Sequence, residues 1–155
     1  AAEPFGNLHI VELTEHVGFG FAVKRALEEV CTKFVLVVQH DQEVIRSFDL
    51  SGVLRAMSSH PQVVKYVGLT SVTTAHYDQM VLSKFRLRLA RTEEFGVPLM
   101  PLIFFYDKPH ICAAQHYRDS ILGEHSLVRR GEFIEETVGK AQRFDILENG
   151  MAAHS

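Results

Sequence analysis

The sequence has few cysteines, no tryptophan and no long apolar run. Its two cysteines, Cys31 and Cys112, cannot build a disulfide framework, and they lack the CxxC spacing of a zinc or redox site. Because both stand among apolar neighbours, we expect buried free thiols in a reducing, intracellular compartment. No apolar run approaches the roughly 20 residues that cross a bilayer, so we expect no transmembrane segment. The first residues also lack the basic and apolar regions of a signal peptide.

A strong positive charge is absent as well. The formal net charge is −3, which argues against a general nucleic-acid or membrane-surface binder and leaves a local basic patch as the alternative. Hydrophobic residues make up 46% of the 155 residues and charged residues 23%, a composition typical of a soluble globular protein. Residues 1–155 are therefore expected to form a single domain.

The hydrophobic pattern predicts alternating strands and helices. Residues 7–13 read as a strand, 19–30 as an amphipathic helix and 34–38 as a second strand, which is a βαβ unit with parallel strands. The fold class expected is α/β, a mainly parallel, Rossmann-like sheet with helices on both faces. The remaining expected elements are strands at 63–69 and 98–106 and helices at 49–59, around 77–85, at 111–122 and at 132–147.

The strand predicted at 34–38 ends at polar side chains that can bind a metal. Asp41 and His40 are ligand types for Mn²⁺ or Mg²⁺, and these ions commonly take substrate phosphates as further ligands. The alternative is a polar turn in which Asp41 caps the next segment. Taken alone, the sequence leaves both interpretations open.

Two glycines, Gly18 and Gly20, stand between the first predicted strand and helix. They lack the third glycine of the dinucleotide fingerprint. A tight connection that needs close backbone packing is the better interpretation of the turn by itself, and phosphate binding is the alternative.

Three glutamates follow a pair of arginines near the end of the chain. Glu132, Glu135 and Glu136 fall at helical spacing, so they share one face of the predicted helix. Carboxylates in a first helical turn commonly stabilise the helix dipole. The functional alternative is a general base that takes a proton from a hydroxyl group.

Asp107 and His110 follow the apolar run 98–106, where they could contact an acceptor or a metal. The nine histidines of the chain show no HExxH or HxxxH spacing, so we expect no dedicated zinc site.

Together these motifs resemble the GT-A fold nucleotide-sugar glycosyltransferases of the family 2-like type. Residues 16–22 look like the family's glycine segment, residues 37–41 like its Asp-x-Asp metal motif, and 131–136 like its acidic acceptor motif. The resemblance implies sugar transfer from a nucleoside-diphosphate donor to an acceptor hydroxyl. It implies the following roles: metal ligands Asp41 and His40 for Mn²⁺ or Mg²⁺; donor contacts Gly18, Gly20 and Gln39; catalytic Glu132, Glu135 and Glu136; acceptor contacts Asp107 and His110.

Two departures from that family shape a rival hypothesis. Gln39 replaces the first Asp of the metal motif, and the family's nucleotide-binding βα units would precede residue 7. The chain would then be the carboxyl-terminal part of a longer domain, or a reduced relative. The rival function is a non-catalytic α/β subunit or pseudoenzyme within a larger protein assembly.

Overall fold

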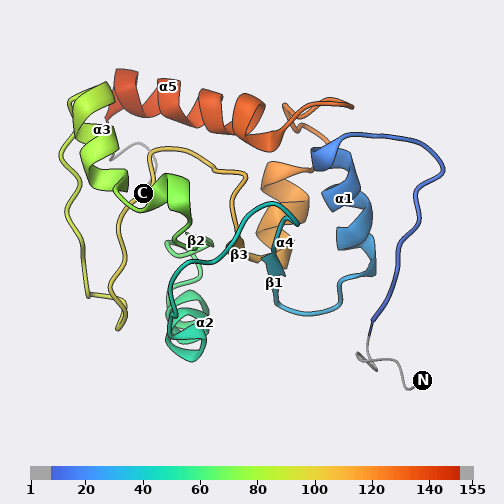
Figure 1. Ribbon diagram of the computed structural model, residues 1–155, viewed down its shortest axis with the longest axis horizontal. Helices are drawn as coiled ribbons and strands as arrows, with labels where there is room; N and C mark the ends of the chain where they lie inside the picture. Colours follow the sequence, from blue (N-terminus) through green and yellow to red (C-terminus); the bar gives the residue numbers. More distant parts are fainter. Residues whose placement is uncertain (1–7, 151–155) are drawn as a thin grey trace.

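The computed structural model describes residues 8–150 (Figure 1). Three short strands and several helices make up the fold, and π-helical turns extend two of the helical segments. The strands are β1 (Phe34–Val37), β2 (Tyr66–Gly68) and β3 (His110–Ala113). The α-helices are α1 (Phe19–Glu29), α2 (Leu50–Ser59), α3 (Tyr77–Phe85), α4 (Ala114–His116) and α5 (Lys140–Asn149). A 3₁₀ turn, η1 (Val72–Thr74), precedes α3, and the π-helical turns are η2 (Tyr117–Ile121) and η3 (Glu135–Gly139).

The sheet is antiparallel, so the expected parallel α/β fold is wrong. The strand order is β1-β3-β2, and both outer strands pair antiparallel with β3. Among the described residues, the segment before α1 forms no strand, and Asn7 lies outside them. Without that strand the expected unit of a strand before α1, α1 and β1 does not form; β1 and β2 are parallel to each other, but β3 lies between them and pairs antiparallel with both.

The apolar run 98–106 is also not a strand, and its prolines give the reason. Pro98 and Pro101 lack the N–H that a strand ladder needs, so the run makes only an isolated bridge between Thr92 and Leu99. The later backbone N–H groups find side-chain acceptors instead. Ile103 donates to the Tyr77 hydroxyl (2.9 Å) and Phe105 to Gln142 Oε1 (2.8 Å).

The helix predicted at 111–122 is partly wrong, because residues 111–113 belong to the central strand β3. The chain becomes helical at Ala114. Ile111 and Cys112 are almost completely buried, and they face opposite sides of the sheet. A continuously apolar segment of this kind suits a strand covered on both faces. The predicted helix at 132–147 begins at Glu135 and ends at Asn149, while the helices around 19–30, 49–59 and 77–85 form close to where they were expected.

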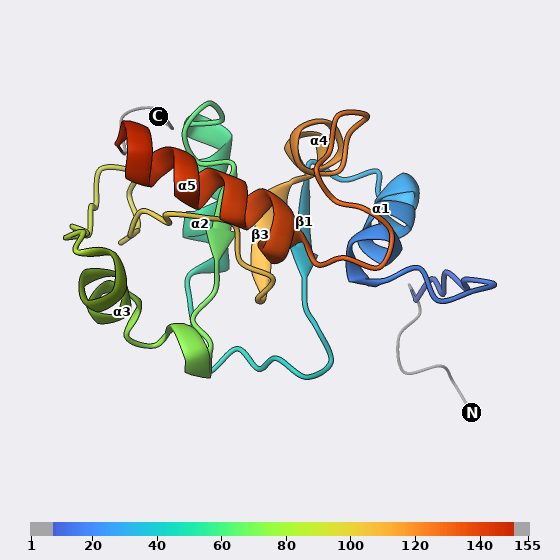
Figure 2. The ribbon, with the colours of Figure 1, turned by 90° about the horizontal axis from the view of Figure 1, so that it is seen from above.

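Both faces of the sheet are packed against helices (Figures 1 and 2). On one face, Cys112 joins a core with α1 and η2, which includes Leu27 and Tyr117. On the other face, Ile111 packs with Met57 of α2. A third core joins α3 and α5 through Ile103 and Tyr106. Burial of this apolar surface is the main stabilising term of the fold.

The sequence predicted two buried thiols and no transmembrane segment. Cys112 is a buried free thiol, whereas Cys31 is exposed, so the expectation that both thiols are buried is wrong for Cys31. Cys31 is exposed because it lies beyond the carboxyl end of α1, after its C-cap residue Val30. None of the helices within residues 8–150 is long and apolar enough to traverse a bilayer.

Candidate functional site

One end of the sheet collects segments that are distant in sequence. Val37 at the end of β1 and Gly68 at the end of β2 both lie opposite His110, the first residue of β3. The residues after β1 and the residues before β3 therefore emerge at the same end. An antiparallel register thus brings together Asp41 and Asp107, which we had expected a parallel sheet to do.

A cleft of about 290 Å³ lies at this end of the sheet, and we call it the acidic cleft. Its polar lining comes from the turn after β1, from the segment before β3 and from η3, and Phe133 adds one aromatic ring. The residues that line it are Gln39, Asp41, Gln42, Asp107, Lys108, Phe133, Glu135 and Glu136. Five of these were predicted site residues: Gln39, Asp41, Asp107, Glu135 and Glu136.

Asp107 and Glu135 are joined by a reciprocal pair of hydrogen bonds. The Asp107 backbone N–H donates to Glu135 Oε2 (3.2 Å), and the Glu135 backbone N–H donates to Asp107 Oδ2 (2.9 Å). Glu135 begins η3, so Asp107 satisfies one of the free N–H groups at that helical start. The contact fixes the segment before β3 against the glutamates, 28 positions later in sequence.

The carboxyl group of Asp107 lies in an unfavourable environment for a charge. The residue is only 5% exposed, and within residues 8–150 its Oδ1 has no hydrogen-bond partner. Burial raises the pKa of Asp107 to about 6; the backbone N–H of Glu135 opposes that rise, and the nearby Glu135 carboxylate adds to it. Such a group can exchange a proton near neutral pH, which is what acid–base chemistry requires.

Gln39 also binds the segment that precedes β3. Its Nε2 donates to the backbone carbonyl of Asp107 at 3.0 Å. The Gln39 carbonyl in turn accepts the N–H of Gln42 (3.2 Å), which closes a turn with Asp41 inside it. An aspartate at position 39, as in the Asp-x-Asp motif, could not donate this hydrogen bond.

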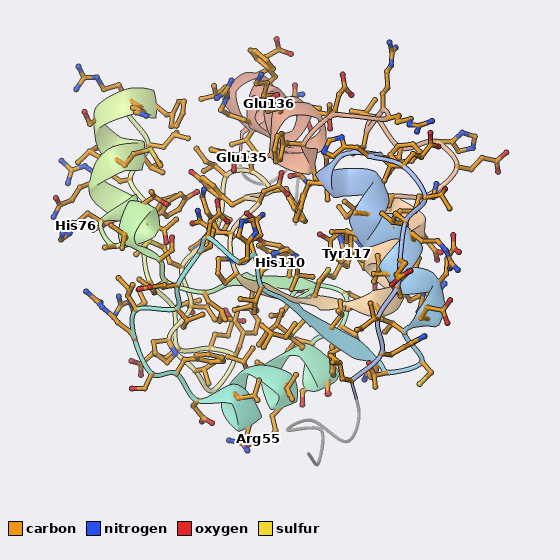
Figure 3. All side chains as sticks on the ribbon, turned by 45° about the vertical axis from the view of Figure 1, so that its right-hand side comes forward. Arg55, His76, His110, Tyr117, Glu135 and Glu136 are labelled. Atoms are coloured by element: carbon orange, nitrogen blue, oxygen red, sulfur yellow. The ribbon has the colours of Figure 1, made fainter. Side chains whose placement is uncertain are left out.

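The three predicted glutamates have three different environments. Glu132 does not line the acidic cleft; its Oε2 accepts the backbone N–H of Arg129 (2.9 Å) and so closes a local loop. Glu135 lines the cleft but is held by Asp107. Glu136 lines the cleft, is exposed, and no side-chain hydrogen bond or ion pair to it is found in the described part of the chain. Figure 3 shows Glu135 and Glu136 close together near the start of α5.

The predicted metal ligands are Asp41 and His40. Both are exposed, but only Asp41 lines the cleft. Within residues 8–150, no three His, Cys, Asp or Glu side chains are grouped so that they could hold a metal ion. Asp41 is therefore the one predicted metal ligand that reaches the acidic cleft.

His110 has no access to the cleft. It is fully buried, its Nδ1 lies 2.6 Å from the Lys108 carbonyl, and its Nε2 lies 3.2 Å from the Tyr117 hydroxyl. Burial lowers its pKa to about 4, so the ring is neutral near pH 7. The rings of Tyr66, Phe105 and Tyr117 surround it, and Figure 3 shows it in the interior below the glutamates. The structure therefore gives His110 a place in the core rather than at an acceptor.

Gly18 and Gly20 pack against the loop that leads to the glutamates. A Cβ on Gly18 would lie 2.6 Å from Gly131 Cα, and a Cβ on Gly20 would lie 2.7 Å from Val128 Cγ1. Gly18 also has φ +84°, which disfavours other residues. Gly131 N–H donates to the Val17 carbonyl at 3.0 Å. This geometry corresponds to the close-packing alternative for the glycine turn, and neither glycine lines the acidic cleft.

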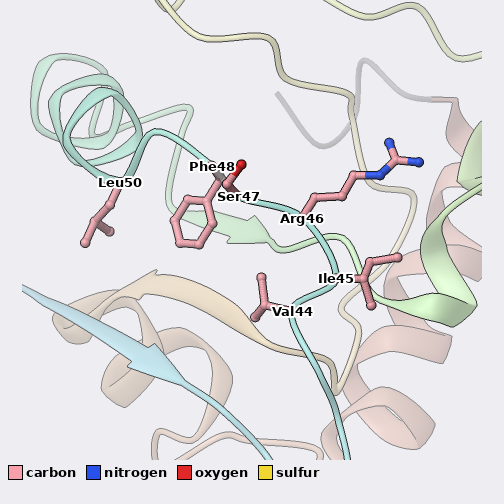
Figure 4. A pocket seen from close by; sticks show the side chains of 6 residues that line it. All are labelled: Val44, Ile45, Arg46, Ser47, Phe48 and Leu50. Carbon is pink, nitrogen blue, oxygen red and sulfur yellow. The ribbon is translucent and has the colours of Figure 1, made fainter.

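A second hollow, of about 520 Å³, lies along the connection between β1 and α2 (Figure 4). Most of its lining is apolar, and Arg46 supplies one cation. The lining residues are Val44, Ile45, Arg46, Ser47, Phe48 and Leu50. Large apolar side chains in this stretch are about 40% exposed, Phe48 among them. These side chains form a shallow, open apolar surface that a partner molecule could cover.

Sequence reasoning did not select three residues that line the acidic cleft: Gln42, Lys108 and Phe133. Lys108 is the cation among these lining residues, and its charge lowers the pKa of Asp107. Each of the three stands directly beside a residue or motif that was predicted. Treating whole strand-end segments as site candidates would have included them.

Comparison with known proteins gives no match: no family model, curated protein or solved structure resembles this chain significantly.

Proposed function

We propose that the acidic cleft is part of a transferase site that moves a sugar from a nucleoside-diphosphate donor to a hydroxyl acceptor. The observation that carries the proposal is the gathering of Asp41, Lys108 and Glu136 around one cleft. Cationic groups stabilise a departing diphosphate, and a free carboxylate can deprotonate an attacking hydroxyl. A cleft of about 290 Å³ is at the small end of ligand sites, so it would hold the reacting part of the donor and acceptor.

Each residue has a role that follows from its surroundings. Glu136 is the general base, because its carboxylate is exposed in the cleft while that of Glu135 is engaged by Asp107. Lys108 binds a phosphate oxygen through its ammonium group. Asp41 would hold Mn²⁺ or Mg²⁺ together with the donor phosphates, and the cation would supply Lewis-acid stabilisation of the leaving group.

The test is release of nucleoside diphosphate from a panel of UDP- and GDP-sugars with Mn²⁺ and an acceptor. Asp41→Asn is expected to remove the dependence on Mn²⁺, and Glu136→Gln to lower the rate by about 100-fold or more. Glu132→Gln tests the choice among the glutamates and is expected to keep the rate, and Glu148→Gln, exposed on α5, is the control. Equal losses in Glu132→Gln and Glu136→Gln would contradict the assignment of the base.

The rival function, a non-catalytic subunit of a larger assembly, is favoured by the apolar hollow between β1 and α2. Thermal unfolding separates the two. A donor site is stabilised by Mn²⁺ with UDP, by about 2.7 kcal/mol at a ligand concentration of 100 times Kd. No shift together with no diphosphate release would refute the transferase proposal and leave the subunit hypothesis.

A further inference from the structure

Gln39, Asp107 and Glu135 are joined by consecutive hydrogen bonds. Gln39 donates to the carbonyl of Asp107 (3.0 Å), and Asp107 and Glu135 exchange two backbone-to-carboxylate hydrogen bonds (3.2 and 2.9 Å). We call this the Gln39–Asp107–Glu135 network. It starts at the turn after β1, passes through the segment before β3 and ends at the first turn of η3.

The network ends beside the two carboxylates that the proposed reaction needs. Asp41 lies inside the turn closed by the Gln39 carbonyl and the Gln42 N–H. Glu136 is the residue after Glu135, and its N–H donates to the Phe133 carbonyl at 3.2 Å. A shift of Gln39 or Glu135 would therefore move one of these carboxylates relative to the other.

We propose that the Gln39–Asp107–Glu135 network is a positioning device that sets the separation between Asp41 and Glu136, and that Gln39 acts in it as a hydrogen-bond donor, not as a metal ligand. The effect of the network on the reaction rate rests on the proposed function, whereas its effect on the structure does not. It gives a physical reason for glutamine at position 39: the amide donates to a carbonyl that a carboxylate would repel.

Further contacts hold the same segment, so the network has a rigid support. Phe105 N–H donates to Gln142 Oε1 at 2.8 Å, and a Cβ on Gly139 would lie 2.5 Å from the Phe105 carbonyl. The hydroxyl of Tyr66 donates to the Tyr106 carbonyl at 2.7 Å. Backbone groups just before Asp107 are thus fixed by side chains, and groups held this way can maintain a geometry to within the tolerance that catalysis demands.

The test compares Gln39→Glu with Gln42→Glu in the full chain. Both variants add one negative charge to the lining of the acidic cleft, but only Gln39→Glu removes the donor to Asp107. Amide hydrogen exchange of Asp107 and Glu135 is expected to become about tenfold faster in Gln39→Glu and to stay unchanged in Gln42→Glu. Equal exchange in the two variants would overturn the network, whether or not the protein transfers a sugar.

A second pair of variants tests the other end. Glu135→Gln keeps an oxygen that accepts the Asp107 N–H, whereas Glu135→Ala does not. If transfer activity is present, Glu135→Ala is expected to lower kcat about 100-fold with little change in KM, and Glu135→Gln to restore most of it. Equal losses in both would assign direct chemistry to the Glu135 carboxylate and refute a positioning role. Absence of transfer in the wild type would refute the proposed function alone, because the exchange experiment does not depend on it.

Discussion

His110 and Asp107 are both buried polar residues at the same end of the sheet, yet their surroundings differ. His110 has a hydrogen-bond partner for each ring nitrogen and aromatic rings around it. Asp107 lines a cleft, and in the described residues its Oδ1 has no partner. A buried polar group with all its hydrogen bonds mainly stabilises the fold. A buried polar group that lacks a partner destabilises it, and at a cleft the binding of a ligand or a proton can recover that free energy.

The two residues also have opposite effects on stability as pH changes. The pKa of His110 is lowered to about 4, so the unfolded state binds the extra proton between about pH 4 and 6.5, and stability rises with pH there. The pKa of Asp107 is raised to about 6, so the folded state binds the extra proton between about pH 4 and 6, and stability falls as pH rises. In the wild type the two contributions largely cancel.

Among the replacements that test this difference, that of His110 is expected to lower the free energy of unfolding most. His110→Ala would leave a cavity and remove the partners of the Lys108 carbonyl and the Tyr117 hydroxyl. The free energy of unfolding should fall by about 3–4 kcal/mol in chemical denaturation. His125→Ala, on an exposed loop, is the control and should change it by less than about 0.5 kcal/mol. A loss for His110→Ala no larger than this control would mean that the ring does not stabilise the core.

Replacing Asp107 tests the same difference through the pH dependence of the free energy of unfolding. Asp107→Asn keeps an oxygen for the Glu135 N–H but removes the titrating group, so the opposing contribution of Asp107 is lost while those of His110 and His116 remain. The free energy of unfolding of the variant should then rise by about 3 kcal/mol more than that of the wild type between pH 4 and 6. Unfolding measured at half-unit pH steps gives both curves. Parallel curves would show that Asp107 titrates at its ordinary pKa.

Removing one partner of His110 should have the smallest effect. Tyr117→Phe keeps the buried ring and deletes only the hydroxyl near His110 Nε2. The expected loss is about 1 kcal/mol in the free energy of unfolding. Tyr66→Phe deletes a hydroxyl that binds the Tyr106 carbonyl instead and is expected to cost a similar amount. An increase in stability for Tyr117→Phe would show that the hydroxyl is not a partner of His110.

Local patterns in the sequence predicted local structure well. The alternation of apolar and charged residues located α1. Asp49, where the second helix was expected to begin, caps α2 by accepting the Gly52 N–H at 2.8 Å. The apolar run 98–106 was misinterpreted because hydrophobicity alone does not distinguish a strand from an extended segment with side-chain partners. Its two prolines carried the missing information.

Strand direction could not be read from local patterns, since it depends on which segments pair. The error had a limited effect on the candidate site. Asp41 and Asp107 line one cleft because the end of β1 lies beside the start of β3, where Val37 is opposite His110, and the hydrogen bonds between Asp107 and Glu135 bring Glu136 to the same cleft. The reciprocal bonds of Asp107 with Glu135, 28 residues apart, left no signal in the sequence.

The side-chain acceptors of residues 103–107 link two helices through one segment without strand pairing. Tyr77 of α3 accepts the N–H of Ile103, whereas Gln142 and Glu135 of the continuous η3–α5 helix accept those of Phe105 and Asp107. Separating either helix from this segment would leave an amide without its partner, so the two helices should unfold together. In a native-state exchange experiment, the amides of Ile103, Phe105 and Asp107 would then report a single opening event instead of three.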